Sequence, residues 1–113
     1  MSQNRNKLIG LFIGNMSNCV IHKILEKAVD EENIRNHYDK ELLNSLEIAK
    51  RYREQINPSH KALPDKDIVD IKQKIITKVN SELRLRVEKG YKNIDLGLVE
   101  ETVDELLKET KTI

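Results

Sequence analysis

The sequence predicts an all-α fold, a compact four-helix bundle formed by one domain over residues 1–113. Apolar residues recur at intervals of three and four along most of the chain, which is the period of a helix buried on one side. Aromatic residues make up only 4% of the chain, so Ile, Leu and Val must fill the core. Charged residues make up 35%, above the globular average of about 25%, which suits helices with wet outer faces.

The first predicted helix covers residues 7–29 and is apolar around most of its circumference. One arc carries Ile9, Phe12, Ile13, Met16, Val20 and Ile24, and a second carries Leu11, Ile21, Leu25, Ala28 and Val29. Only a narrow stripe between them is polar, made of Asn15, Asn18, His22 and Glu26. A helix covered in this way belongs inside a bundle or at a dimer interface. We therefore expect this helix to organise the others, with Met1–Asn6 outside it.

Small residues form a groove along the same helix. Each glycine inside a helix costs about 1 kcal/mol relative to alanine, and a row of small side chains lets another helix approach closely. We predict a homodimer, or contact with another protein partner, through this part of the helix. The predicted interface residues are Gly10, Phe12, Ile13, Gly14, Met16 and Ser17.

Helical spacing also defines the second element, over residues 32–56. Its apolar positions are Ile34, Tyr38, Leu42, Leu46, Ala49, Tyr52 and Ile56. The helix should end at Asn57, because the residue before a proline avoids the α region. Residues 59–64 then form a short linker.

The third helix is predicted over residues 65–89 and the fourth over 95–109. Asp65 or Asp67 can cap the start of the third helix, and Gly90 suits the left-handed position after its end. Asp95 is expected to cap the fourth helix, whose buried stripe is Val99, Val103, Leu106 and Leu107. The short connections predict antiparallel neighbours.

Charge and cysteine content limit the setting of the protein. Twenty basic and nineteen acidic residues leave a net charge of +1, so no overall field attracts nucleic acid or an anionic membrane. The lone Cys19 excludes an internal disulfide and favours a reducing compartment. No stretch approaches the ~18 apolar residues of a membrane span. We expect a cytoplasmic protein with no membrane association.

A seam of histidines and glutamates is the first candidate for chemistry. If the first two helices form an antiparallel hairpin turning at Glu31 and Glu32, His22 lies level with Glu41 and Glu26 with His37. Imidazole and carboxylate groups in a helical bundle can bind zinc or iron, or act as an acid–base pair. The established E-x-x-H and H-E-x-x-H spacings are absent. A solvent-exposed face is the preferred interpretation, and buried His–Glu pairs are the next alternative.

Two basic runs are candidates for contacts with nucleic acid: Lys50, Arg51 and Arg53 in the second helix, and Arg84 and Arg86 in the third. Such side chains bind phosphates, although near helix C-termini they also suit the helix dipole. The spacing of Arg53 and His60 is similar to the arginine–histidine motif of the all-α HEPN ribonucleases. Glu54 stands where that motif carries Asn, Asp or His, so we assign no family.

Nucleophilic catalysis by Cys19 has little support. His22 lies one turn away, but a mid-helix thiol among apolar neighbours is typical of an inert core residue. We assign no catalytic residue. The function that the sequence favours is a self-associating helical interaction module. A metal-dependent or acid–base enzyme and a nucleic-acid-binding protein are the alternatives.

Overall fold

A computed structural model of the chain describes residues 2–57 and 61–113. The elements are α1 (Ser2–Ala28), α2 (Glu32–Ile56), α3 (Asp65–Glu88), the one-turn 3-10 helix η1 (Leu96–Leu98) and α4 (Val99–Glu109). They pack into a body of 44 × 23 × 21 Å. The predicted all-α, four-helix bundle is confirmed.

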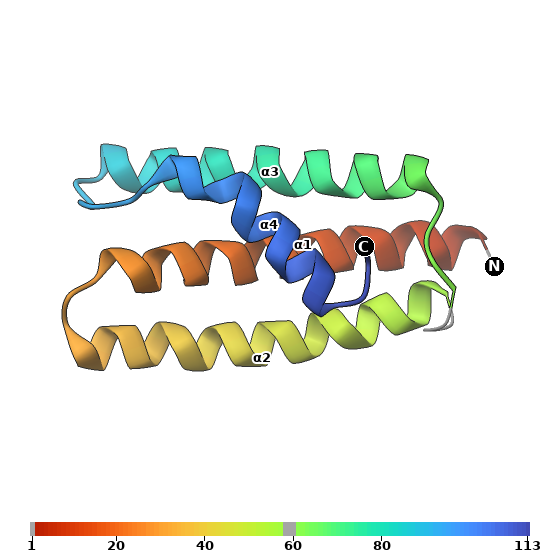
Figure 1. The fold of residues 1–113 in the computed structure, drawn as a ribbon, viewed down its shortest axis with the longest axis horizontal. Helices are drawn as coiled ribbons and strands as arrows, with labels where there is room; N and C mark the ends of the chain where they lie inside the picture. Colours follow the sequence, from red (N-terminus) through yellow and green to blue (C-terminus); the bar gives the residue numbers. More distant parts are fainter. Residues whose placement is uncertain (1, 58–60) are drawn as a thin grey trace.

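The central element is α1, which contacts each of the other three α-helices. It runs between α2 and α3, antiparallel to α2 and parallel to α3, while α4 crosses obliquely over it (Figure 1). Direct contacts between α2 and α3 are sparse in the described part of the chain. The bundle is therefore a layer of three long helices with α4 on one face.

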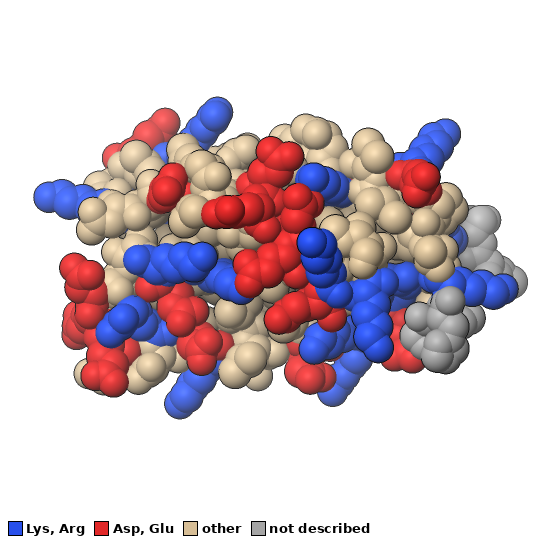
Figure 2. Space-filling model, in the orientation of Figure 1, with Lys and Arg blue, Asp and Glu red and all other residues tan. Residues whose placement is uncertain are grey.

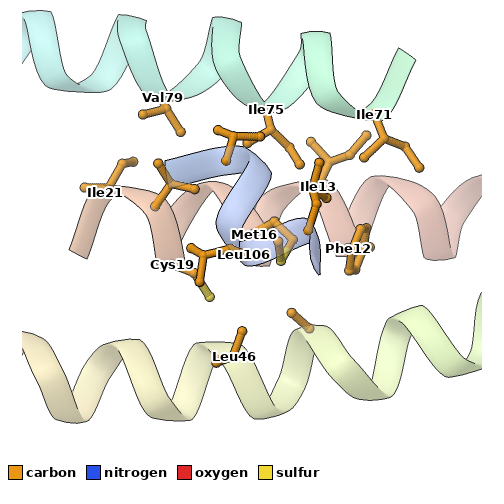
Figure 3. Close-up of a cluster of buried hydrophobic side chains, with 14 of the residues drawn as sticks. Phe12, Ile13, Met16, Cys19, Ile21, Leu46, Ile71, Ile75, Val79 and Leu106 are labelled. Atoms are coloured by element: carbon orange, nitrogen blue, oxygen red, sulfur yellow. The ribbon is translucent and has the colours of Figure 1, made fainter. Parts of the chain in front are cut away.

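The core forms where α4 crosses this layer. Phe12, Met16, Cys19 and Val20 of α1 are fully buried, and they meet apolar side chains from each of the other helices. Figure 3 shows Ile71, Ile75 and Val79 of α3, Leu46 of α2 and Leu106 of α4 directed toward them. Burial of a large aliphatic side chain contributes about 1.5–3 kcal/mol. The broad apolar surface of α1 is needed because it faces three partners.

Ion pairs flank the apolar contacts of α4. Lys72 lies 2.9 Å from Asp104, and Lys23 lies 2.5 Å from Glu105. The hydrogen bond to Asp104 raises the pKa of Lys72, and the hydrogen bond from Lys23 lowers the pKa of Glu105. Acidic side chains gather along α4 in Figure 2. Since exposed ion pairs contribute at most about 1 kcal/mol each, the buried stripe of α4 supplies most of its docking energy.

The first helix begins earlier in the structure than we predicted. We predicted a start at Lys7, but α1 begins at Ser2. The guanidinium of Arg5 lies 2.6 Å from the Asp67 carboxylate at the start of α3. This ion pair joins residues that are 62 positions apart, so the local pattern could not reveal it.

The same helix requires a second correction. By length and composition alone, Arg5–Ala28 could cross a membrane, contrary to the expectation that no stretch approaches this criterion. Half of its most apolar window is buried inside the bundle, and the core helix of a soluble protein meets the same criterion of length and composition. Length and composition therefore do not distinguish a membrane-spanning helix from the core helix of a soluble protein.

Left-handed residues end both α3 and α4. Gly90, with φ of 101°, follows α3 as predicted, and the amide of Tyr91 donates to the carbonyl of Arg86. After α4 the corresponding residue is Lys111, with φ of 59°, and the amide of Thr112 donates to Leu107. A lysine therefore occupies a position that usually favours glycine.

Asp95 acts as a cap, but of a different turn from the one predicted. Its carboxylate accepts a hydrogen bond of 2.9 Å from the amide of Gly97 and so closes η1. The α-helical part of the fourth helix begins only at Val99. The predicted boundary at residue 95 was therefore four residues early.

Candidate functional site

Four of the six predicted interface residues lie in the core of the chain itself. Phe12, Met16 and Ser17 are fully buried, and Ile13 is 9% exposed. The Ser17 hydroxyl donates to the carbonyl of Ile13 within the helix. In this fold these four side chains are covered by the chain's own helices, so their part in an interface stays a prediction that this burial does not favour. Because α1 is apolar on most sides, its sequence does not show which arc faces the chain's own helices.

The two glycines of that prediction lie outside the core. A Cβ atom built on Gly10 would meet no atom within 4 Å. One built on Gly14 would meet only the ammonium nitrogen of Lys78, at 3.9 Å. Leu11 beside them is 39% exposed, and Asn18 is exposed as well. No helix of the described chain uses the groove that these small residues leave.

The predicted His–Glu seam is only partly assembled. The His22 ring stacks on Tyr38, with 6.0 Å between ring centroids, and His37 lies 3.9 Å from Glu41 on α2. Glu26 instead lines a shallow pocket with Lys23, Lys27 and Arg35. No three His, Cys, Asp or Glu residues among those described are placed to hold a metal ion. Zinc or iron binding stays a prediction that this geometry does not favour.

His22 is nevertheless an unusual residue. Burial lowers its pKa, and the positive charges of Arg86 and His37 act in the same direction, while Glu41 opposes them. Its Nδ1 atom is buried without a hydrogen-bond partner, as is Nε of Arg86. The Arg86 guanidinium lies over the Tyr91 ring at 5.7 Å. The neutral imidazole therefore suits this position, where it stacks between helices.

The predicted nucleic-acid residues do not form one surface. Lys50, Arg51 and Arg53 lie toward the end of α2, and Arg84 and Arg86 toward the end of α3, at opposite ends of the long axis (Figure 1). Lys50, Arg51 and Arg84 are exposed and Arg86 is half-buried, whereas Arg53 is only 4% exposed. Nucleic-acid binding stays a prediction, and the separation of the two groups argues against a shared phosphate-binding face.

Arg53 is the most distinctive charged side chain in the fold. Its Nη1 donates to the amide oxygen of Asn57 at 2.7 Å, and its Nη2 to the carbonyls of Lys61 at 3.2 Å and Lys111 at 3.3 Å. Its Nε is buried with no hydrogen-bond partner among the residues that the structure describes, and burial lowers its pKa. All three acceptors are neutral. His60, the other half of the predicted arginine–histidine pair, lies outside the described residues.

A pocket of about 340 Å³ opens beside Arg53. Its walls come from α2, from the end of α4 and from the turn after it, and they carry Lys50, Arg53, Glu54, Glu109 and Lys111. Basic side chains gather around this end of the molecule in Figure 2. The sequence reasoning missed Glu109 and Lys111, because they lie more than fifty residues from Arg53 along the chain.

Cys19 is fully buried, as the sequence suggested. Burial raises the pKa of its thiol to about 12, with a small contribution from Glu109. A thiol in this state is protonated at neutral pH and shielded from reagents. It has a packing role.

Comparison with protein-family models, with curated protein sequences and with solved structures finds no match for this chain. The functional argument therefore rests on the geometry described above.

Proposed function

We propose that this protein is a small helical interaction module that forms a homodimer through the uncovered face of α1. That face is defined by Gly10, Leu11, Gly14, Asn15 and Asn18. The supporting observation is that two glycines occupy the interior of the central helix although nothing within the chain requires them.

Both glycines lower the stability of the α1 helix. Gly10 and Gly14 together cost about 1–2 kcal/mol of helix stability relative to alanine. Alanine would fit at both positions, because neither Cβ would meet backbone or core atoms. If a helix from outside the chain packs closely against α1 at these positions, that contact would explain why glycine occupies them in place of alanine. The cost of each glycine is then offset in the complex.

A second copy of the chain suits this face better than a strongly charged partner. The net charge of +1 produces little repulsion between copies. Asn18 presents an exposed amide, which can donate and accept at once and so can pair with itself across a two-fold axis. The groove between Gly10 and Gly14 can receive an exposed Leu11 from the partner.

Sedimentation equilibrium at micromolar concentration tests the proposal. The unmodified chain should sediment as a dimer, and Gly14→Leu should shift it to a monomer by filling the groove. Thr77→Leu adds the same bulk at an exposed position on α3 and should leave the dimer intact. A monomeric unmodified chain, or a Gly14→Leu variant that dimerises equally well, would refute the proposed interface.

A further inference from the structure

We propose that the pocket beside Arg53 binds a small anion bearing a carboxylate or phosphate group. Lys50 and Lys111 would contact it directly, and the buried Arg53 would supply a fixed positive charge beneath them. This site is separate from the uncovered face of α1. It uses only residues of α2, of the end of α4 and of the turn that follows it.

The unpaired charge of Arg53 is the main support. A buried charge is costly unless it is paired, because it loses its hydration. Every Asp and Glu of the chain lies within the described residues, yet none forms an ion pair with Arg53. Among the described residues its three acceptors are an amide oxygen and two peptide carbonyls, and its Nε has no partner there. The charge of this guanidinium is solvated by dipoles but not neutralised.

The charged side chains that line the pocket indicate which kind of ligand would neutralise its net charge. Among the described residues, three cationic side chains and two carboxylates line the pocket, which leaves an excess of one positive charge. A single anionic group restores balance, whereas a polyanion such as a nucleic acid would meet the carboxylates of Glu54 and Glu109. The charge balance therefore favours a small molecule with one carboxylate or phosphate group.

The backbone at Lys111 gives the pocket its shape. Because this residue is left-handed, with φ of 59°, its carbonyl is placed against Arg53 while its side chain lines the pocket. A non-glycine residue in this conformation is sterically strained, because its Cβ lies close to the following carbonyl oxygen. Glycine would end the helix more cheaply but would remove the ammonium group, so the ligand would account for the lysine.

Pocket size is consistent with a small ligand. Ligand pockets generally span about 300–1,000 Å³, and this one, at about 340 Å³, lies near the lower limit. The aliphatic stems of its lysines, arginine and glutamates provide apolar surface for the body of such a molecule.

Nuclear magnetic resonance of the side-chain Nε–H of Arg53 provides a direct readout in the full-length chain. Sodium phosphate and sodium acetate are each titrated at constant pH and ionic strength, with sodium chloride as the balancing salt. We expect a saturable shift of the Arg53 signal with at least one of the two anions, and the stronger one identifies the preferred group. A shift equal to that in chloride, or one that never saturates, would overturn the proposal.

Variants separate the pocket from general charge effects while leaving Arg53 in place. Lys50→Ala and Lys111→Gly should each weaken binding about two- to fivefold, which is the effect expected of an exposed ion pair. Lys108→Ala removes an exposed lysine of α4 that does not line the pocket and should bind as the unmodified chain does. Equal affinities in all three variants would place the anion elsewhere and refute the site.

Discussion

The guanidinium of Arg53 donates a 3.3 Å hydrogen bond to the carbonyl oxygen of Lys111 and so joins α2 to the turn after α4. The same group holds the carbonyl of Lys61, in the connection between α2 and α3. One buried side chain thus links α2 to the connection that follows it and to a turn 58 residues away in the sequence. Loss of the Arg53 side chain should therefore weaken the contacts of all three segments.

Replacing Arg53 by methionine should destabilise the fold by about 1–3 kcal/mol. The methionine can fill the space, but the carbonyls of Lys61 and Lys111 would lose their donor. Urea unfolding measures the effect. Arg51→Met is a matched control, because Arg51 is exposed on the same helix and its replacement should change stability by less than about 0.5 kcal/mol. Equal stabilities of the two variants would show that the Arg53 contacts carry no net energy.

Lys111→Gly should stabilise the unliganded protein by about 1 kcal/mol. Glycine adopts the left-handed conformation observed at this position without the steric cost that a lysine bears. The same substitution at Lys108, inside the last turn of α4, should instead destabilise by up to about 1 kcal/mol. Thermal and urea unfolding of the pair therefore test the backbone geometry, and a loss of stability in Lys111→Gly contradicts it.

Stability should fall as the pH is lowered through the range in which His22 becomes charged. Because burial holds the pKa of folded His22 below its ordinary value of 6.5, the unfolded chain binds a proton more readily than the folded one. The stability that His22 contributes is therefore fully present above its folded and unfolded pKa values. It is lost progressively as the pH falls below about 6.5 toward the folded pKa.

Urea unfolding at pH 7.5 and 5.5 checks this sign. His22→Gln should show a smaller loss of stability over that interval than the unmodified chain. His37→Gln is the control, since its side chain is 70% exposed, and it should retain most of the dependence. The opposite slope, with stability rising toward pH 5.5, would mean that His22 gains a partner for its charged form.

Cys19 should resist thiol reagents until the bundle opens. Its thiol is buried and burial raises its pKa to about 12, so neither access nor thiolate is available in the native state. Reaction with a chromogenic disulfide at pH 8 should be slow without urea and complete in denaturing urea. An exposed cysteine introduced by Ser81→Cys in a Cys19→Ala background sets the rate for a free thiol. A similar rate for native Cys19 would contradict the buried position.

Periodicity was sufficient to predict most of the fold. The spacing of Ile71, Ile75, Val79 and Leu83 marks the buried face of α3, and all four side chains are buried. Pro58 marked the end of α2, and Gly90 the end of α3. These signals are local, so each could be interpreted without knowledge of the partners of the helix.

The predictions were wrong where a helix boundary or the environment of a side chain depends on contacts with residues distant in the sequence. The start of α1 depends on the pair of Arg5 with Asp67, and the environment of Arg53 on the turn after α4. One local signal for Arg53 was present, because it follows Leu42, Leu46 and Ala49 at spacings of four, three and four. All of these residues are buried, so a basic residue in this series indicated a buried charge. We interpreted Arg53 instead as part of an exposed basic run with Lys50 and Arg51, and so overlooked its position on the buried face of the helix.

The central position of α1 has a consequence for how the protein opens. Because α2, among the described residues, packs extensively on α1 alone, it can detach without disturbing the contacts of α1 with α3 and α4. The molecule thus consists of a three-helix unit and one peripheral helix, which is held at its far end by the hydrogen bonds of Arg53. The protection of the α2 amide protons against exchange with solvent should therefore depend mainly on the contact of α2 with α1. An anion seated beside Arg53 would act on this opening first, by holding the end of α2 against the turn after α4.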